Sequence, residues 1–202
     1  MTTTEFVIVL AMALLFGVVF ASIEIIKRRW NISPEIMRRV AHIASGLLVL
    51  LDYVLLSPVF FIALVGGGWF AFFAASKLKL LTAVNDVARR TYGQYVLTAG
   101  YLGAFGISQF EPAVFVPSVL IVTFADSFAG LVGTLVRSAR RTMLGSLVFF
   151  VIALGLLIAT GAAPVLVAIG VAATLTLIER VSPLGLDNVT IPVAAALLLL
   201  VL

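Results

Sequence analysis

The residues best suited to chemistry in this chain surround Asp126, an acidic residue near the middle of a long apolar run. The run extends from Val114 to Val136 and carries no second charged residue. A carboxylate at such depth in a membrane-crossing segment is costly and usually marks a functional site. Three small residues, Ala129, Gly130 and Gly133, follow at helical spacing and share its helix face. The pattern predicts one acid beside a smooth groove where backbone can approach another group closely.

Arginines and small residues follow this run. Arg137, Arg140 and Arg141 come directly after it, and Gly145-Ser146 begin the next apolar run. Carboxylates hold divalent metals, arginines neutralise phosphates, and a helix N-terminus offers N–H groups to an anion. We therefore predict a metal and phosphate site. Helix packing and membrane orientation are alternative roles for the glycines and arginines, but neither role explains the acid.

The length of a helix sets a structural expectation for this site. An unbroken helix would place Asp126 about 16 Å from Arg137, at about 1.5 Å per residue. One metal site could not use both residues directly at that distance. We therefore expect either a broken or re-entrant segment near residues 130–133, or a deep cytoplasmic cleft.

A polar stripe leads into the second apolar run. Ser33-Pro34 is a typical helix start, with serine as the N-cap and proline at the first helical position. The residues that follow on one helix face are Glu35, Arg38, Arg39, His42 and Gly46. A juxtamembrane cluster that contacts anionic lipid would explain the arginines, but it explains the histidine less well. We interpret the stripe as a functional surface that enters the membrane from the cytoplasmic side.

Two further segments add polar residues. Arg89 and Arg90 end the segment 77–93, where they either set membrane orientation or, as part of a lid, bind phosphates. The turn between the last two apolar runs contains Glu179, Asp187 and Asn188. The last two suit a helix cap, but a capped helix N-terminus beside other polar residues can still bind an anion. Both segments therefore belong to the predicted site.

The composition identifies an integral membrane protein. Of the 202 residues, 63% are hydrophobic and 11% are charged, whereas soluble domains are about half apolar and about a quarter charged. The chain has no cysteine and one histidine, which excludes disulfides, thiol catalysis and a multi-histidine zinc site. We attribute the net charge of +4 to cytoplasmic loops rather than to nucleic-acid binding.

Apolar runs divide the chain into about eight predicted membrane spans. They fall at 5–26, 40–56, 58–76, 94–110, 113–136, 143–161, 164–181 and 189–202. If the spans alternate in direction, all 13 Lys and Arg residues fall on one side, which the positive-inside rule makes cytoplasmic. The sequence predicts an all-α, polytopic helical bundle with both termini outside and a cleft that faces the cytoplasm. We expect a single transmembrane domain, 1–202, with a first span and basic anchor over 1–30.

Four segments, in this order, resemble the integral-membrane CTP-dependent lipid kinases. This family includes dolichol kinase, phytol kinase and CTP-dependent diacylglycerol kinase, and CDP-diacylglycerol synthases are distant relatives. The resemblance is carried by the stripe from Glu35 to Gly46, by Ala125 to Gly130 with Gly133, by Arg141 to Ser146, and by Glu179, Gly185, Asp187, Asn188 and Ile191-Pro192. It covers 33–202 as a kinase-like core. The chain departs from the family pattern at Arg141, where lysine is usual, and at Leu144, where glutamate is common.

The resemblance implies a kinase that transfers the γ-phosphoryl group of CTP, or of another nucleoside triphosphate, to a lipid alcohol such as phytol, geranylgeraniol or a polyprenol. It implies Mg²⁺ held by Asp126, Asp187 and Glu179, and catalytic roles for Asp126, His42 and Asp187. The implied nucleotide and phosphate contacts are Arg38, Arg39, Arg89, Arg90, Gly130, Gly133, Arg141, Gly145, Ser146 and Asn188. The expected location is the inner or plasma membrane of the cell, with the active site on the cytoplasmic side.

Two other functions remain open from the residues alone. A cytidylyltransferase acting on a lipid phosphate would use the same residues and release pyrophosphate. A small ion- or proton-coupled transporter would use Asp126 as its ion site, but we find no internal repeat and the polar residues gather on one side. The expected partners are a nucleoside triphosphate, a lipid alcohol and the bilayer, with no nucleic acid, and a homodimer is left open.

Overall fold

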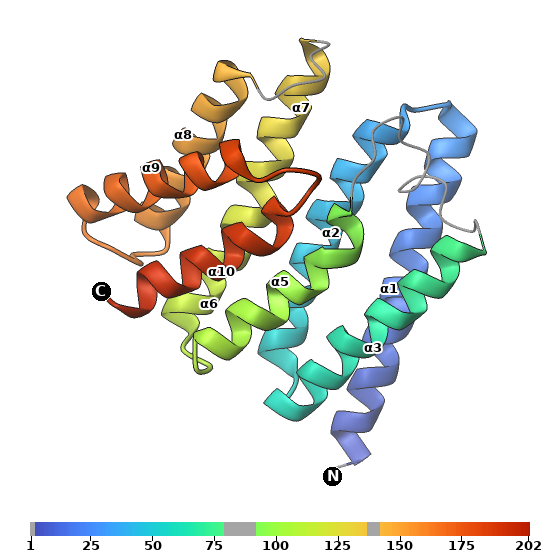
Figure 1. Cartoon of the computed structure of the whole chain (residues 1–202). Coiled ribbons are helices and arrows are strands. Elements are labelled where there is room, and N and C mark those ends of the chain that lie inside the picture. Colours follow the sequence, from blue (N-terminus) through green and yellow to red (C-terminus); the bar gives the residue numbers. More distant parts are fainter. Residues whose placement is uncertain (1–2, 79–91, 137–141) are drawn as a thin grey trace. The chain divides into compact units, whose positions relative to one another are not determined.

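The computed structural model describes residues 3–78, 92–136 and 142–202 (Figure 1). All regular secondary structure in these ranges is helical. The elements are α1 (Thr3–Trp30), α2 (Pro34–Leu55), α3 (Pro58–Lys77), α5 (Gly93–Ile107), α6 (Pro112–Leu120), the π-helix η1 (Ile121–Asp126), α7 (Ser127–Leu135), α8 (Met143–Ala159), α9 (Val165–Val181) and α10 (Asp187–Leu200). The predicted all-α fold is confirmed for this part of the chain.

The helices follow the predicted apolar runs closely. Each run overlaps helical structure in the described ranges, and α6, η1 and α7 together cover the fifth run. Three helical segments are long and apolar enough to cross a membrane: Thr3–Trp30, Pro58–Lys77 and Pro112–Leu135. Tyr95–Ile107, Met143–Ala159 and Asp187–Leu200 are apolar but shorter. Membrane helices are thus supported, whereas the number of spans, their orientation and the location of the termini stay predictions.

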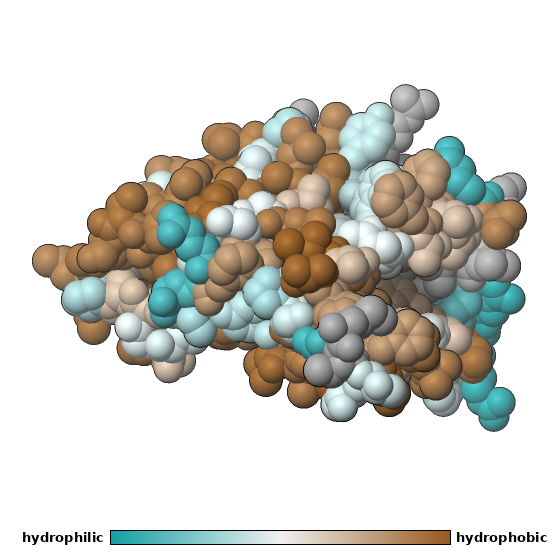
Figure 2. All heavy atoms as spheres, turned by 90° about the horizontal axis from the view of Figure 1, so that it is seen from below, coloured by the Kyte–Doolittle hydropathy of each residue, from teal (hydrophilic) through white to brown (hydrophobic). Residues whose placement is uncertain are grey.

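Exposed apolar side chains are abundant on the surface. Leu14, Leu166 and Val201 expose 70%, 82% and 80% of their surface. Figure 2 shows large apolar areas on one face of the molecule. Apolar surface of this extent is unfavourable in water and is expected where a protein meets lipid. The surface therefore agrees with the composition in indicating a membrane protein.

The chain divides into two compact units, Met1–Arg90 and Thr91–Leu202. In the first unit α1 packs against α2 and α3. The core of this unit contains the buried side chains of Ile23, Met37 and Ala41, with Phe20 and Phe72 packed against them. The expectation of one transmembrane domain over 1–202 stays a prediction.

The start of α2 has the structure that the sequence predicts. The Ser33 hydroxyl accepts a hydrogen bond from the Ile36 N–H at 3.4 Å, and Pro34 is the first helical residue. Serine supplies the acceptor that the first turn lacks, and proline has no N–H to leave unpaired. The helix is therefore set in register at its first turn, which places the polar stripe on one face.

In the second unit α10 packs against α5, α6, η1 and α9. Its closest approach to α5 depends on Gly100, where a Cβ would lie 2.1 Å from the Asn188 carbonyl oxygen and 3.0 Å from Pro192 Cγ. One turn later, a Cβ on Gly103 would lie 2.9 Å from Val193 Cγ2. Small residues permit such close helix contacts. The first turn of α10 therefore packs directly against α5.

The helical segment over the fifth apolar run is not broken where the sequence suggested. α7 continues from Ser127 to Leu135 through Gly130 and Gly133, so the first of the two expected alternatives, a break at 130–133, is wrong. The other alternative, a deep cytoplasmic cleft, stays a prediction. A glycine weakens a helix by only about 1 kcal/mol, and a membrane favours a helix whose backbone hydrogen bonds all stay paired. The irregularity lies earlier, in η1, which ends at Asp126. Such wide turns are rare and occur frequently at functional sites.

Candidate metal and phosphate site

Three acidic residues that are far apart in the sequence come together in the second unit. Asp126, Glu179 and Asp187 each offer a carboxylate oxygen, and these three atoms lie within 4.8 Å of one another. The three residues are buried, with 4%, 6% and 8% of their surface exposed. They are the residues for which the sequence predicted a metal-binding role. We refer to them as the acidic cluster.

Two acids of the cluster lie at helix ends, and Asp126 lies where η1 continues into α7. Asp126 is the last residue of η1, Glu179 lies in the last turn of α9, and Asp187 is the first residue of α10. A helix dipole favours a carboxylate at the N-terminus and disfavours one at the C-terminus. Local helical structure therefore stabilises Asp187 and works against Glu179. Asp187 is not an N-cap, since Leu186 holds that position without a side-chain hydrogen bond.

The acidic cluster forms without a break in the helix that carries Asp126. Arg137, whose distance from Asp126 raised the expectation of a break, lies outside the described residues. Asp126 lies about 14 Å along its helix from the end of α7 at Leu135. The other two acids come to it, because the turn between α9 and α10 lies at the level of Asp126. These helices have 17 and 14 residues, fewer than the roughly 20 that span a bilayer. Short helices, rather than a break at the glycines, bring the acids together.

The turn between α9 and α10 holds two of the acids in place. The hydroxyls of Ser182 and Thr190 are hydrogen bonded at 2.8 Å, which joins the end of α9 to the first turn of α10. Leu184 and Gly185 have left-handed backbone conformations, with φ of 54° and 87°. The Tyr92 N–H donates to the Leu184 carbonyl at 2.9 Å, so the same turn is also attached to the start of α5.

The donors of the acidic cluster fit a hard divalent cation. Like charges at this separation repel, and the repulsion grows as the surroundings become less polar. Buried charges in proteins are usually paired or coordinate a metal. Mg²⁺ takes oxygen ligands at about 2.1 Å, so oxygens on opposite sides of it are about 4.2 Å apart. The chemistry, number and spacing of the carboxylates therefore suit one such cation.

Other buried oxygens belong to residues close to the acids in the sequence. Thr123 precedes Asp126 by three residues, Ser127 directly follows Asp126, and Asn188 directly follows Asp187. Thr123 Oγ1, Ser127 Oγ and Asn188 Oδ1 are buried and have no hydrogen-bond partner within the described ranges. Buried polar atoms without a partner are uncommon and call for an explanation. Thr123 was not among the predicted site residues, and Ser127 was part of the resembling motif without an assigned role. Polar residues in an apolar run were the available signal for both.

The start of α8 explains Gly145 by local structure. The Thr142 hydroxyl accepts a hydrogen bond from the Gly145 N–H at 3.0 Å. A Cβ on Gly145 would lie 3.2 Å from the Ala129 carbonyl oxygen of α7. Capping and helix packing therefore account for this glycine. Helix packing was the alternative role that the sequence left open for the glycines. Its predicted role in phosphate binding, like that of Ser146, stays a prediction.

Ser146 has a basic neighbour from another helix. The Arg180 guanidinium donates a hydrogen bond to the Ser146 hydroxyl at 3.3 Å. Arg180 is exposed and directly follows Glu179 of the acidic cluster. The sequence analysis used this arginine only as a marker of membrane orientation. Its position makes it an additional candidate for phosphate binding.

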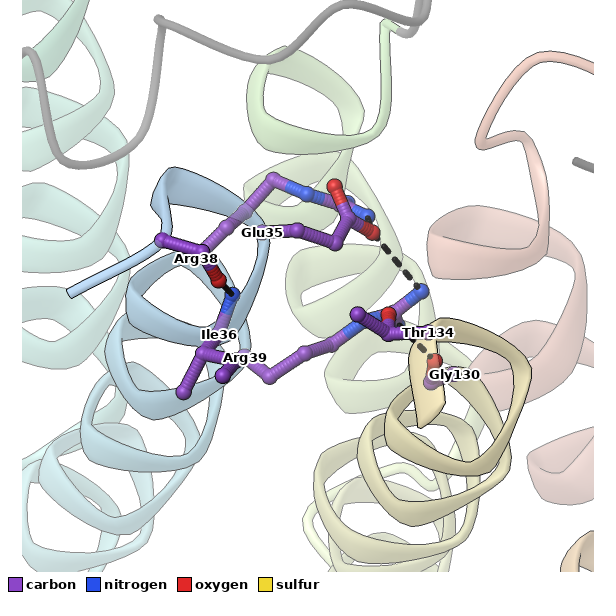
Figure 3. Close-up of polar contacts among 7 residues, drawn as sticks. Glu35, Ile36, Arg38, Arg39, Gly130 and Thr134 are labelled. Atoms are coloured by element: carbon purple, nitrogen blue, oxygen red, sulfur yellow. Dashed lines mark hydrogen bonds and ion pairs between the residues drawn. The ribbon is translucent and has the colours of Figure 1, made fainter. Parts of the chain in front are cut away.

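The two predicted glycines of α7 differ in their surroundings. The Thr134 hydroxyl donates to the Gly130 carbonyl at 3.0 Å within the helix (Figure 3). A Cβ on Gly133 would meet nothing within 4 Å among the described residues. No described residue would contact a side chain at Gly133, and its predicted roles in a groove and in phosphate binding stay predictions.

In the first unit the predicted polar stripe lies on α2, and Figure 3 shows three of its residues, Glu35, Arg38 and Arg39. Glu35 Oε1 is 2.5 Å from Arg38 Nη2 and 3.8 Å from Arg39 Nη2. Arg38, Arg39 and His42 are buried, with 7%, 6% and 6% of their surface exposed. Arginine side chains suit phosphate oxygens, and two of them lie here on one helix face.

Three predicted phosphate-binding residues, Arg89, Arg90 and Arg141, lie outside the described residues. The structure therefore brings together the predicted metal ligands in the second unit and groups the predicted basic stripe in the first. It leaves the three remaining arginines as sequence predictions.

Comparison with known proteins gives one informative relative. A phytol kinase from Synechocystis sp. is 29% identical over 206 aligned residues, which cover 90% of this chain and 85% of the relative. No protein-family model matches the chain, and no solved structure matches it. The similarity extends over nearly the whole chain, and it supports a distant relationship to the lipid kinase family that the motifs resemble.

Proposed function

We propose that this protein is a membrane lipid kinase, because it is distantly related to a phytol kinase and gathers three buried carboxylates in one cluster. The proposed donor is CTP or another nucleoside triphosphate, and the proposed acceptor is an isoprenoid or other lipid alcohol. The observation that carries the proposal is the acidic cluster, because phosphoryl transfer from nucleotides uses carboxylate-bound metal ions to neutralise phosphate charge.

In the proposed reaction the alcohol oxygen forms a bond to the γ-phosphorus while the bond to the β-phosphate oxygen breaks. The nucleoside diphosphate leaves with that oxygen, and the alcohol proton passes to a base. Such reactions depend mainly on positioning and on stabilising charge. Bound Mg²⁺ supplies positive charge against the phosphate oxygens.

The residues of the chain have distinct proposed roles. Asp126, Glu179 and Asp187 hold the cation, and their burial keeps them free of competing water. His42 or a carboxylate of the cluster accepts the alcohol proton. The proposed phosphate contacts are Arg38, Arg39, Arg89, Arg90, Arg141, Gly130, Gly133, Gly145 and Ser146, with Arg180 as an addition from its contact with Ser146.

The membrane setting bears on the proposed acceptor. A lipid alcohol has an apolar tail that is stable in the bilayer, and the exposed apolar surface of the helices is compatible with a site reached sideways from lipid. We propose a multi-pass protein of the inner or plasma membrane, with the site on the cytoplasmic side, where the nucleotide is present.

Product analysis tests the proposed function. Purified protein in lipid nanodiscs would be given Mg²⁺, CTP labelled in the γ-phosphate and, separately, phytol, geranylgeraniol, a polyprenol or diacylglycerol. The proposal predicts a labelled lipid phosphate and CDP, and no product from Asp126→Asn. Pyrophosphate with a CDP-lipid from a lipid phosphate would instead identify a cytidylyltransferase. Absence of any product with the whole panel would contradict the kinase.

A further inference from the structure

Asn188 has a buried polar atom that the proposed mechanism does not explain. The residue is 4% exposed. Its Oδ1 is buried and has no hydrogen-bond partner within the described chain. An unsatisfied buried acceptor is destabilising, so a native protein usually retains one where a water, an ion or a ligand satisfies it.

The backbone of Asn188 is held on both sides. Its N–H donates to the Gly185 carbonyl at 3.3 Å and lies 3.1 Å from Asp187 Oδ1. Its carbonyl oxygen faces Gly100 of α5, where a Cβ would approach to 2.1 Å. A backbone carbonyl cannot rotate away as a flexible side chain can. The backbone of Asn188 is therefore fixed directly after Asp187 in the first turn of α10.

We propose that Asn188 is a ligand of the cation held by the acidic cluster, contributing its Oδ1 as a fourth protein oxygen. The inference rests on the proposed function and deepens it. Amide carbonyl oxygens are normal ligands of hard divalent cations. They add a donor without adding a fourth negative charge to a group of three buried carboxylates. The inference also separates Asn188 from the nucleotide-binding role that the sequence suggested.

Metal binding without nucleotide tests this proposal. Mn²⁺, a paramagnetic substitute for Mg²⁺, would be titrated into the full-length protein in nanodiscs, and free Mn²⁺ would be measured by electron paramagnetic resonance. Asn188→Ala is expected to bind Mn²⁺ about 10- to 100-fold more weakly than the unmodified protein, the range reported for losing metal-site partners. Asn188→Asp retains an oxygen at the same place and is expected to bind at least as tightly.

A glycine pair on α5 supplies the matched control. Gly100→Ala places a methyl group against the Asn188 carbonyl and is expected to weaken Mn²⁺ binding. Gly106→Ala lies on the same helix, where a Cβ meets nothing within 4 Å among the described residues, and is expected to leave binding unchanged. Circular dichroism of each variant would verify that the helical fold is retained.

Several outcomes would overturn the proposal. Unchanged Mn²⁺ affinity in Asn188→Ala, together with a raised KM for CTP, would make Asn188 a nucleotide contact. Equal weakening in Asn188→Asp and Asn188→Ala would show that the residue acts through packing. Should Asn188→Ala not fold, weaker binding by Asn188→Asp would still contradict the assignment. Failure of the unmodified protein to bind Mn²⁺ would instead refute the metal site on which both proposals rest.

Discussion

The polar face of α2 and the acidic cluster bury ionisable groups in opposite ways. On α2, Glu35 lies between two arginines, so an acid is matched by bases from its own helix. In the acidic cluster three acids from η1, α9 and α10 lie within 4.8 Å of one another. The first arrangement combines opposite charges from one helix. The second combines like charges from three elements, and a bound cation would stabilise it.

This difference indicates how each group depends on the fold. The α2 face is set by helical spacing, so the register of one helix is enough to form it. The acidic cluster depends on tertiary packing, including the seat of α10 on Gly100 and the hydrogen bond between Ser182 and Thr190. Small changes in packing should therefore affect the cluster more than the α2 face.

The largest expected effect comes from removing a charge from the cluster. Asp126→Asn, Glu179→Gln and Asp187→Asn each keep the side-chain size but remove a negative charge. Each is expected to lower kcat for lipid phosphorylation by at least about 10²-fold, as for loss of a preorganised electrostatic contact. Glu111→Gln, at an exposed acid that begins α6 without a side-chain cap, is the control and should retain activity. Similar activity in all four variants would show that the three acids of the cluster matter no more for catalysis than the exposed Glu111.

A smaller effect is expected on the α2 face. Arg38→Gln and Arg39→Gln should raise the KM for CTP by about tenfold or more, since hydrogen bonds to charged groups contribute about 1.5–3 kcal/mol. Arg28→Gln is the control, because Arg28 also pairs with an acid, Glu24, at 2.7 Å but is largely exposed. Initial rates at varied CTP would measure the change. A lower kcat with unchanged KM in the Arg38 and Arg39 variants would count against phosphate binding.

Packing at Gly145 is expected to affect stability more than nucleotide affinity. Gly145→Ala places a Cβ 3.1 Å from Thr142 Oγ1 and 3.2 Å from the Ala129 carbonyl, so the thermal unfolding temperature should fall. Gly133→Ala fills open space and should raise helix stability by up to about 1 kcal/mol. Thermal melts of both variants in the same detergent measure the contrast. A raised KM for CTP in Gly145→Ala without loss of stability would favour the phosphate-binding role over packing.

The smallest expected effect concerns the turn that joins α9 to α10. Ser182→Ala removes the hydroxyl that is bonded to Thr190 at 2.8 Å and to the Ile178 carbonyl at 2.7 Å. One net hydrogen bond contributes about 1 kcal/mol, so a small loss of stability and a modest loss of metal affinity are expected. Thr176→Val is the control, since its hydroxyl bonds only to its own helix, at the Ala172 carbonyl. Equal effects in both variants would show that the turn does not position the cluster.

The sequence predicted the helices and the identity of the clustered acids for physical reasons that are local. Apolar runs of membrane length define helices, and a carboxylate inside such a run is costly enough to stand out. Asp126 was recognised in this way, and Glu179 and Asp187 by polar residues gathered near one turn and by their resemblance to a family motif. The start of α2 could also be predicted from local sequence, because Ser33 and Pro34 determine the first turn of their own helix.

The parts that were missed depend on contacts between elements. Glycines suggested a break in α7, but a helix surrounded by apolar neighbours retains its hydrogen bonds, and the irregularity appeared as a π-turn that no residue pattern marked. Gly100 could be recognised only once Asn188 was known to lie against it. The sequence also could not predict that the turn after α9 lies beside Asp126, because this position follows from packing rather than from composition.

Binding of a divalent cation by the acidic cluster tests the central claim most directly. Mn²⁺ would be titrated into the unmodified protein and into Asp126→Asn in nanodiscs, without nucleotide, and the bound metal would be quantified by electron paramagnetic resonance. The account predicts saturable binding of one Mn²⁺ per chain that Mg²⁺ displaces and that Asp126→Asn abolishes. Equal binding by both proteins, or no binding by the unmodified protein, would contradict the assignment of the three carboxylates as a metal site.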